Sequence, residues 1–212
     1  MRMNNTNKMI ALTFDDGPAP TTIPIIEALS AGDSAATFFA NGMHLEKYPD
    51  IALYAADIGC EIGNHTSDHR HLPELDYDEI VSQIESTTQL IRSITGQQPT
   101  LMRPPFGEYN ETVKRAAKDC GLALVNWSID PNDWDTDDAD VTRQRILNEI
   151  KDCSVVLCHD RMPSNAVLMP RFIPELKELG YALVTVSQLF AARGIQLMPG
   201  TLYLSPDDEP ER

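Results

Sequence analysis

Two adjacent carboxylates, Asp15 and Asp16, stand at the end of an apolar run near the start of the chain. The run 9–12 predicts a short buried strand, and Gly17-Pro18 predicts a turn directly after it. Neighbouring like charges repel each other, which raises the pKa of at least one carboxyl group. A cation alongside would remove this repulsion, because one aspartate could bind it while the other moves protons. An isolated Asp-Asp-Gly is more often a solvated turn, so the metal hypothesis needs support from other residues.

Two histidines four residues apart, His65 and His69, are the second candidate for metal chemistry. This spacing would place both imidazoles on one face of a helical turn, where they could share a metal ion. An exposed or purely structural pair is the alternative. Two imidazoles and a strand-end carboxylate leave coordination positions open, which is the pattern of catalytic zinc sites. His71 lies one residue too far round the turn, and we expect it outside the ligand set.

A rigid segment follows in Arg103-Pro104-Pro105-Phe106-Gly107. The two prolines hold the backbone extended, so that the arginine and the following amides have fixed positions. An arginine near Asp15 would keep that carboxylate ionised and oriented. A backbone N–H after the prolines could donate to a developing oxyanion. The alternative is a stiff surface loop with a solvated arginine.

Two further segments combine groups that suit sugar chemistry. The segment 127–134 contains two tryptophans together with Asp130 and Asp133, which suits a sugar-binding wall and a charge partner for an imidazole. An Asp-rich turn with a core tryptophan is the ordinary alternative. His159 ends the apolar run 155–158. A core histidine is the default interpretation, and a general acid is the functional one, because imidazole transfers protons well near neutral pH.

The elements that must position these residues alternate regularly along the chain. Apolar runs predict seven strands, at 8–14, 35–40, 59–63, 100–103, 121–126, 153–158 and 181–185. Helical patterns occupy 21–31, 46–58, 77–95, 110–119, 139–151, 167–179 and 187–193, with Asp76 as a possible N-cap and Gly96 as a stop signal. Seven βα units predict an α/β fold with a mainly parallel sheet and outer helices, either barrel-like or doubly wound. Functional residues of such folds gather at the carboxyl ends of the strands, and the polar residues named above fall there.

Composition sets broad limits. The 212 residues predict one domain over 1–204, followed by an acidic, proline-containing tail at 205–212 that we expect to be disordered. The net charge of −15 argues against nucleic acid or an anionic membrane as a partner, and no apolar run is long enough to span a membrane. The four cysteines form no C-x-x-C pair and are expected to be buried free thiols. The polar segment 1–8 has no apolar core of a secretion signal, and the compartment stays open.

Taken together, these residues resemble the NodB-homology polysaccharide deacetylases, carbohydrate esterase family 4. Five motifs occur in the family's order, at 13–18, 65–69, 103–107, 130–134 and 157–159, and the resemblance covers about 9–204. It implies an irregular (β/α) barrel with about seven parallel strands. Phe106 stands where tyrosine is common, and Arg70 replaces a frequent proline.

The resemblance also implies a metal-dependent hydrolase that removes acetyl groups from N-acetylated glycans, either peptidoglycan or chitin oligomers. We expect the protein to be a monomer. The ion would be Zn²⁺, with Co²⁺ or Ni²⁺ possible. The implied roles are metal binding by Asp16, His65 and His69, general base for Asp15, general acid for His159 with support from Asp133, orientation of Asp15 by Arg103, an oxyanion donor in the backbone of Phe106, and substrate contacts by Trp134, Leu157 and Pro105. Three alternatives remain at this point: an acetylxylan O-acetyl esterase, a small-molecule amidase, and a non-catalytic glycan-binding module.

Overall fold

A parallel β-sheet that curls into an irregular barrel forms the centre of the molecule. The computed structural model describes residues 8–211. The strands are β1 (Lys8–Asp15), β2 (Thr37–Ala40), β3 (Glu61–Asn64), β4 (Leu101–Met102), β5 (Ala123–Val125), β6 (Val155–His159), β7 (Tyr181–Leu183) and β8 (Leu202–Tyr203). The order is β6-β1-β2-β3-β4-β5-β8, with β7 paired to the first half of β1. The seven strands expected from the sequence are confirmed, and the short β8 is an addition.

The barrel closes through the segment that follows β5. Ile129 forms a parallel bridge with Val156 of β6, and its carbonyl accepts a hydrogen bond from Leu157. The register between β1 and β6 aligns Asp15 with His159. Since every ladder between the named strands is parallel, the carboxyl ends of β1, β3 and β6 meet at one rim of the barrel.

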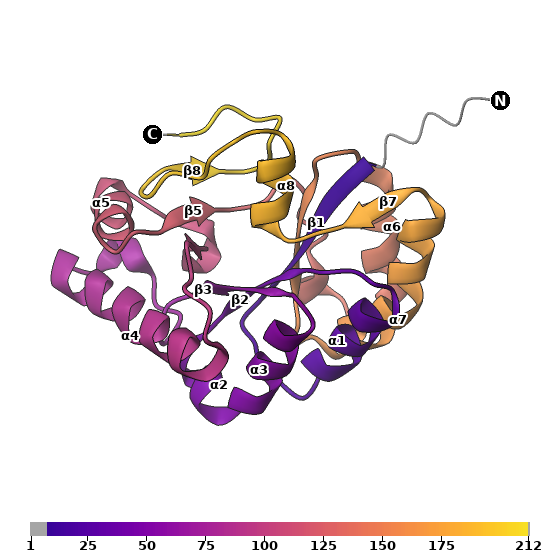
Figure 1. Ribbon diagram of the computed structural model, residues 1–212, viewed down its shortest axis with the longest axis horizontal. Coiled ribbons are helices and arrows are strands. Elements are labelled where there is room, and N and C mark those ends of the chain that lie inside the picture. Colours follow the sequence, from indigo (N-terminus) through magenta and orange to yellow (C-terminus); the bar gives the residue numbers. More distant parts are fainter. Residues whose placement is uncertain (1–7, 212) are drawn as a thin grey trace.

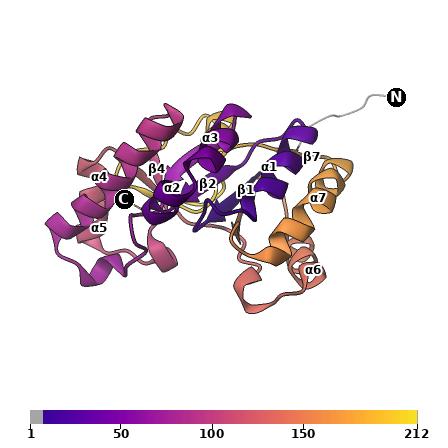
Figure 2. The same cartoon turned by 90° about the horizontal axis from the view of Figure 1, so that it is seen from below.

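Within residues 8–211, eight α-helices pack against the sheet (Figures 1 and 2). They are α1 (Thr22–Ala31), α2 (Gly42–Lys47), α3 (Pro49–Asp57), α4 (Tyr77–Thr95), α5 (Glu111–Asp119), α6 (Ala139–Glu149), α7 (Pro163–Glu178) and α8 (Val186–Ala192). In both views α4 and α5 lie on one side and α6 and α7 on the other. The helix expected at 46–58 is in fact two helices, because Pro49 lacks the N–H that would continue α2 and instead begins α3.

Helix α4 shows how local sequence fixes an element. The side chain of Asp76 accepts a hydrogen bond from the Glu79 N–H, and the Glu79 carboxylate accepts one from the Asp76 N–H. This capping box satisfies two N-terminal donors, and Gly96 ends the helix in the left-handed conformation. Both boundary signals expected from the sequence are confirmed.

Alternate residues of β1 pack into two different layers, as expected for a strand buried on both faces. Ile10, Leu12 and Phe14 belong to a cluster that includes residues of α1 and α7. Ala11 belongs to another cluster, in which Val155 of β6 and Phe190 of α8 are also buried. The end of β1 is therefore held rigidly on both sides, which fixes the position of Asp15.

The C-terminal segment differs from the disordered tail that we expected. Leu202 and Glu211 form an antiparallel bridge, Ser205 is buried, and the Tyr109 hydroxyl donates to the Glu211 carboxylate. Polar composition alone did not reveal these pairings. Residues 1–7 and Arg212 lie outside the described residues.

All four cysteines are free, as expected, and Cys60, Cys153 and Cys158 are buried, whereas Cys120 is only half-buried. Within 8–211, no helix is both long and apolar enough to cross a membrane.

Candidate active site

One cavity of about 510 Å³ opens at the rim where the carboxyl ends of β1, β3 and β6 meet. The loops after β4 and β5 complete its wall. We call this the main cavity. Its lining residues are Asp15, Asp16, His65, His69, Phe106, Trp127, Asp130, Trp134, Leu157 and His159. The convergence expected from parallel topology therefore holds for side chains from five separate segments.

Asp16, His65 and His69 form a group that could hold a metal ion, with one ligand atom from each residue lying within 4.8 Å of the others. Asp16 Oδ1 lies 3.5 Å from His65 Nε2 and 3.2 Å from His69 Nε2. Burial alone would raise the pKa of Asp16, but its hydrogen bond with His65 and the charges of both histidines hold that pKa below its usual range. Two imidazole nitrogens and an ionised carboxylate at the edge of an open cavity suit a divalent ion such as zinc.

The loop that carries the two histidines differs from the helical turn that the spacing predicted. Residues 65–71 contain no helix, and Thr66 and His69 have φ values of 63° and 61°. The His69 N–H donates to Thr66 Oγ1 across this loop. The rings still meet, with centroids 5.0 Å apart, because two left-handed residues turn the chain back toward the cavity.

His65 has its tautomer fixed by the backbone. Its Nδ1–H donates to the Arg103 carbonyl at 2.7 Å, and the ring is buried. This contact leaves the Nε2 lone pair directed at the group of ligand atoms, which is how outer hydrogen bonds usually orient metal-binding histidines. The same rigid segment after β4 therefore positions both His65 and Arg103.

Asp15 is held by a fully buried arginine. Arg103 Nη1 donates to Asp15 Oδ1 at 2.7 Å and also to Thr13 Oγ1. Its remaining donors, Nε and Nη2, reach the carbonyls of Val125 and Asn126. With Oδ1 occupied in this way, Oδ2 is the oxygen closest to the candidate metal site, 3.8 Å from His65 Nε2. The close association of Arg103 and Asp15 expected from the sequence is present.

His159 and Asp133 form a second charged pair across the main cavity from the histidine loop. His159 Nδ1 donates to Asp133 Oδ1 at 2.7 Å, and the His159 N–H donates to Asp133 Oδ2. Burial by itself would lower the pKa of His159, but the hydrogen bond and charge of Asp133 raise it to about 9. The imidazolium form is therefore favoured at neutral pH, with Nε2 available for proton transfer.

Asn165 is a partner that the sequence did not reveal. This buried residue in the first turn of α7 donates through Nδ2 to Asp133 Oδ2 and to the His159 carbonyl. It thereby fixes the carboxylate that orients His159. An asparagine at a helix start carries no signal of such a contact, and only the packing of α7 against β6 brings it there.

Phe106 and Trp134 are exposed residues of the cavity wall, and Leu157 is buried beside them. Phe106 has φ 60°, and within the described part of the chain no acceptor takes its backbone N–H. Its ring stacks on His71, with centroids 4.0 Å apart, and the His71 imidazole donates to Glu108 outside the group of ligand atoms. Pro105, expected to contact substrate, is buried and does not line the cavity.

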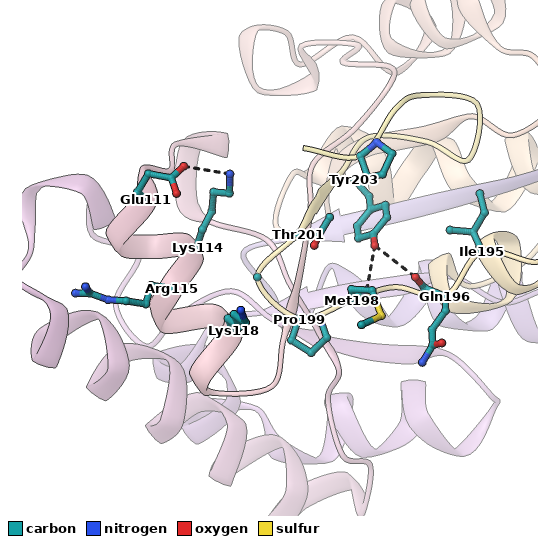
Figure 3. Close-up of a pocket in the computed structure, with 12 residues that line it drawn as sticks. Glu111, Lys114, Arg115, Lys118, Ile195, Gln196, Met198, Pro199, Thr201 and Tyr203 are labelled. Carbon is teal, nitrogen blue, oxygen red and sulfur yellow. Dashed lines mark hydrogen bonds and ion pairs between the residues drawn. The ribbon is translucent and has the colours of Figure 1, made fainter. Parts of the chain in front are cut away.

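A larger cavity of about 820 Å³ lies elsewhere, between α5 and the segment 195–203 (Figure 3). Its walls carry Lys114, Lys118 and Met198, while Figure 3 shows Arg115 directed away from that segment. The cavity brings together no histidine and no pair of carboxylates, so its lining offers neither metal ligands nor an acid–base pair. The chemistry is concentrated at the barrel rim.

The chain is similar to several known proteins. Residues 2–125 match the family model described as "Polysaccharide deacetylase". The chain is 38% identical over 183 residues to the peptidoglycan-N-acetylmuramic acid deacetylase PdaC of Bacillus subtilis (strain 168), covering 86% of this chain and 38% of that protein. It is 34% identical over 204 residues to the peptidoglycan-N-acetylglucosamine deacetylase PgdA of Listeria monocytogenes serotype 1/2a (strain 10403S), covering 96% of this chain and 42% of that protein.

The fold has close counterparts among solved structures. The structure described as "T48 deacetylase with substrate" superposes with a TM-score of 0.87 at 36% identity, covering 93% of this chain and 97% of that one. The chain spans only 38% and 42% of the lengths of the two sequence relatives. With a family model matched over more than half of its residues and relatives aligned over nearly all of them, the chain belongs to the polysaccharide deacetylase family, carbohydrate esterase family 4.

Proposed function

We propose that this chain is a metal-dependent deacetylase that hydrolyses N-acetyl groups of glycans containing N-acetylglucosamine. One observation carries the proposal: the ligand group of Asp16, His65 and His69 lies in the same cavity as the Asp15–Arg103 pair and the His159–Asp133 pair. A ligand group, a carboxylate base and an imidazolium acid in one cavity are the parts that amide hydrolysis needs. Relatives named for peptidoglycan deacetylation support the substrate class.

A divalent ion held by Asp16, His65 and His69 would supply an acidified water and positive charge near the acetyl carbonyl, and zinc is the ion that the donor set suits best. Asp15 accepts the proton of the attacking water through Oδ2, since Arg103 holds Oδ1. The Phe106 N–H donates to the oxyanion that develops on the carbonyl oxygen. His159 donates its proton to the leaving nitrogen, with the imidazolium oriented by Asp133. The products are acetate and a glucosamine unit.

The wall around these groups suits a sugar. Trp134 is 62% exposed at the mouth of the cavity, where an indole face can stack on a pyranose ring. Leu157 is only 4% exposed and gives an apolar contact inside the cavity, suited to the acetyl methyl group. With these contacts, the acetamide would lie between the candidate metal ligands and His159.

The experiment is acetate release from N-acetylglucosamine oligomers, peptidoglycan and acetylxylan. It is measured before and after chelation, and again after zinc or cobalt is added back. We expect chelator-sensitive release from an N-acetylated substrate, restored by the added ion. Release from acetylxylan alone would replace the proposal with an O-acetyl esterase on the same site. No release from any of the three by protein with a bound ion would refute it.

A further inference from the structure

The proposed oxyanion donor lies in a tight turn with an unusual backbone. Residues 104–108, which we call the donor turn, contain two successive left-handed residues, Phe106 with φ 60° and Gly107 with φ 70°. Glycine adopts this conformation freely, whereas it is unfavourable for phenylalanine. The N–H groups of Gly107 and Glu108 donate to the two proline carbonyls of the same turn. The Phe106 N–H is therefore the donor that the turn keeps for an external acceptor, and its position depends on a conformation that needs support.

The Phe106 ring receives support from the loop that carries the histidines. It stacks on His71, with centroids 4.0 Å apart and ring planes 7° from parallel, and it meets His69 edge-on at 4.6 Å. His69 is a candidate metal ligand, so an ion would set the orientation of its ring. His71 does not belong to the ligand group and does not line the main cavity. It is thus the imidazole that can hold the Phe106 ring independently of the ion.

A second contact joins His71 to the same turn. Its Nδ1 donates to the Glu108 carboxylate at 2.8 Å. One imidazole therefore contacts two residues of the donor turn, Phe106 through its face and Glu108 through its edge, and the two contacts together fix the plane of the ring. Both partners of the hydrogen bond are about half exposed, and exposed pairs of this kind contribute little energy. The stack on Phe106 is accordingly the main support.

His71 is itself anchored to the core. The next residue, Leu72, is fully buried and belongs to a cluster that includes Ile80 of α4 and Val113 of α5. The His71 carbonyl accepts a hydrogen bond from the Glu74 N–H, which closes a short helical turn over Leu72–Glu74. The core thus fixes the backbone beside His71, and the His71 ring extends this support to the donor turn.

We propose that His71 is a positioning residue for the deacetylation proposed above: it holds Phe106 in the left-handed conformation that presents the backbone N–H to the oxyanion. The inference rests on the proposed function, in which that N–H is the donor. The oxyanion develops only as the carbonyl is attacked, so a misplaced donor lowers kcat and kcat/KM by the same factor and leaves KM unchanged. His71 acts through the Phe106 ring and touches no reacting atom.

The test is the steady-state kinetics of acetate release by zinc-loaded variants acting on N-acetylglucosamine oligomers. His71→Asn keeps a hydrogen-bond donor but has no ring, and we expect kcat to fall by about fivefold to tenfold with KM unchanged, the scale of one aromatic contact. His71→Phe keeps a stacking face but cannot donate to Glu108, and it should recover most of kcat. In a Phe106→Ala background, His71→Asn should have no further effect on kcat, because the stack is already absent.

Arg70→Ala is the matched control for loosening of the loop. Arg70 directly precedes His71, but its side chain pairs with Glu79 of α4 and lies outside the main cavity, so we expect kcat to stay unchanged. Zinc affinity is measured for every variant by competition with a chromophoric chelator, and we expect His71→Asn to keep the wild-type value.

Four results would overturn the proposal: an unchanged kcat in His71→Asn, a loss that His71→Phe does not recover, an equal loss in Arg70→Ala, and a further loss on adding His71→Asn to Phe106→Ala. A fall in zinc affinity with normal kcat at saturating zinc would also overturn it, because His71 would then support the metal ligand His69 and not the oxyanion donor. Absence of release by the wild type would instead refute the proposed function, so the two failures are distinguishable.

Discussion

The pair of His159 and Asp133 makes a prediction whose size can be worked out from the structure. Asp133 is fully buried, accepts both the ring Nδ1–H and the backbone N–H of His159, and raises the pKa of His159 to about 9. Asp133→Asn keeps the shape of the side chain but removes its charge. Burial of the imidazole, which lowers the pKa, is then less opposed, and we expect the pKa to fall to the ordinary value of 6.5 or below.

The consequence for catalysis follows from the role of His159 as the proton donor. The active form is the imidazolium, so activity is lost as the pH rises through the pKa of His159. At pH 8, a group with a pKa of 9 is about 90% protonated, whereas one with a pKa of 6.5 is about 3% protonated. The expected loss of kcat at pH 8 is therefore about 30-fold, and it should shrink as the pH is lowered toward 6. A bound cation lowers the pKa in both proteins, so the difference between them remains.

The assay is the pH profile of kcat for acetate release by zinc-loaded wild type and Asp133→Asn. Asp130→Asn is the control, because Asp130 lines the same cavity and carries the same charge but accepts from the Asn132 N–H and not from His159. We expect the alkaline limb to move to lower pH in Asp133→Asn and to move far less in the control. An alkaline limb that stays in place in Asp133→Asn would refute the assignment of His159 as the acid.

Two further predictions concern buried charges beside the site. Arg103→Lys keeps a positive charge but cannot make the four hydrogen bonds of the buried guanidinium. Urea denaturation should therefore show a loss of about 2–4 kcal/mol in the free energy of unfolding. An unchanged free energy of unfolding would contradict the structure. Asp160 is buried, accepts from Thr22 Oγ1, and has its pKa raised to about 7, chiefly by burial. Between about pH 4 and pH 7 the folded protein therefore keeps a proton that the unfolded chain has released, so its stability should fall as the pH rises over this range and level off above 7. Asp160→Asn should remove this dependence in metal-free protein unfolded at pH 5 to 8.5, and parallel profiles for the two proteins would count against the assignment.

The sequence predicted where the functional residues lie along the chain because strand ends are easy to locate. Asp15, His65, Arg103 and His159 each end or directly follow an apolar run, and buried parallel strands produce such runs. Parallel topology then brings the ends together whatever the loops do. For this reason the seven strands and the grouping of the polar residues were accessible from the pattern of residues, whereas the choice of a barrel over a doubly wound sheet came only from the family resemblance.

Contacts that depend on packing between distant segments were not accessible. Asn165 reaches Asp133 only because α7 packs against the end of β6. Arg161 and His44 line one small hollow beside Asp16 and His69 although they are far apart in sequence. The C-terminal segment folds back because the backbone of Glu211 pairs with the edge of β8 and its carboxylate accepts a hydrogen bond from the Tyr109 hydroxyl. None of these residues carries a local pattern that distinguishes it from an ordinary surface position.

The local backbone of the site escaped prediction for a different reason, which is strain. Among residues 8–211, five of the seven non-glycine residues with positive φ lie in loops at the rim: Asp16, Thr66, His69, Phe106 and Asn132. A left-handed conformation costs an L-residue about 1–2 kcal/mol, and propensity rules therefore favour other conformations, such as the helical turn expected at 65–69. At its carboxyl end, a parallel strand points the backbone away from the barrel. The loop that follows must reverse the direction of the backbone to bring a side chain back over the rim, and left-handed residues allow this reversal within a few residues. The strain is located where ligands and donors must be re-aimed, and the core that buries β1 on both faces supplies the stability that maintains it.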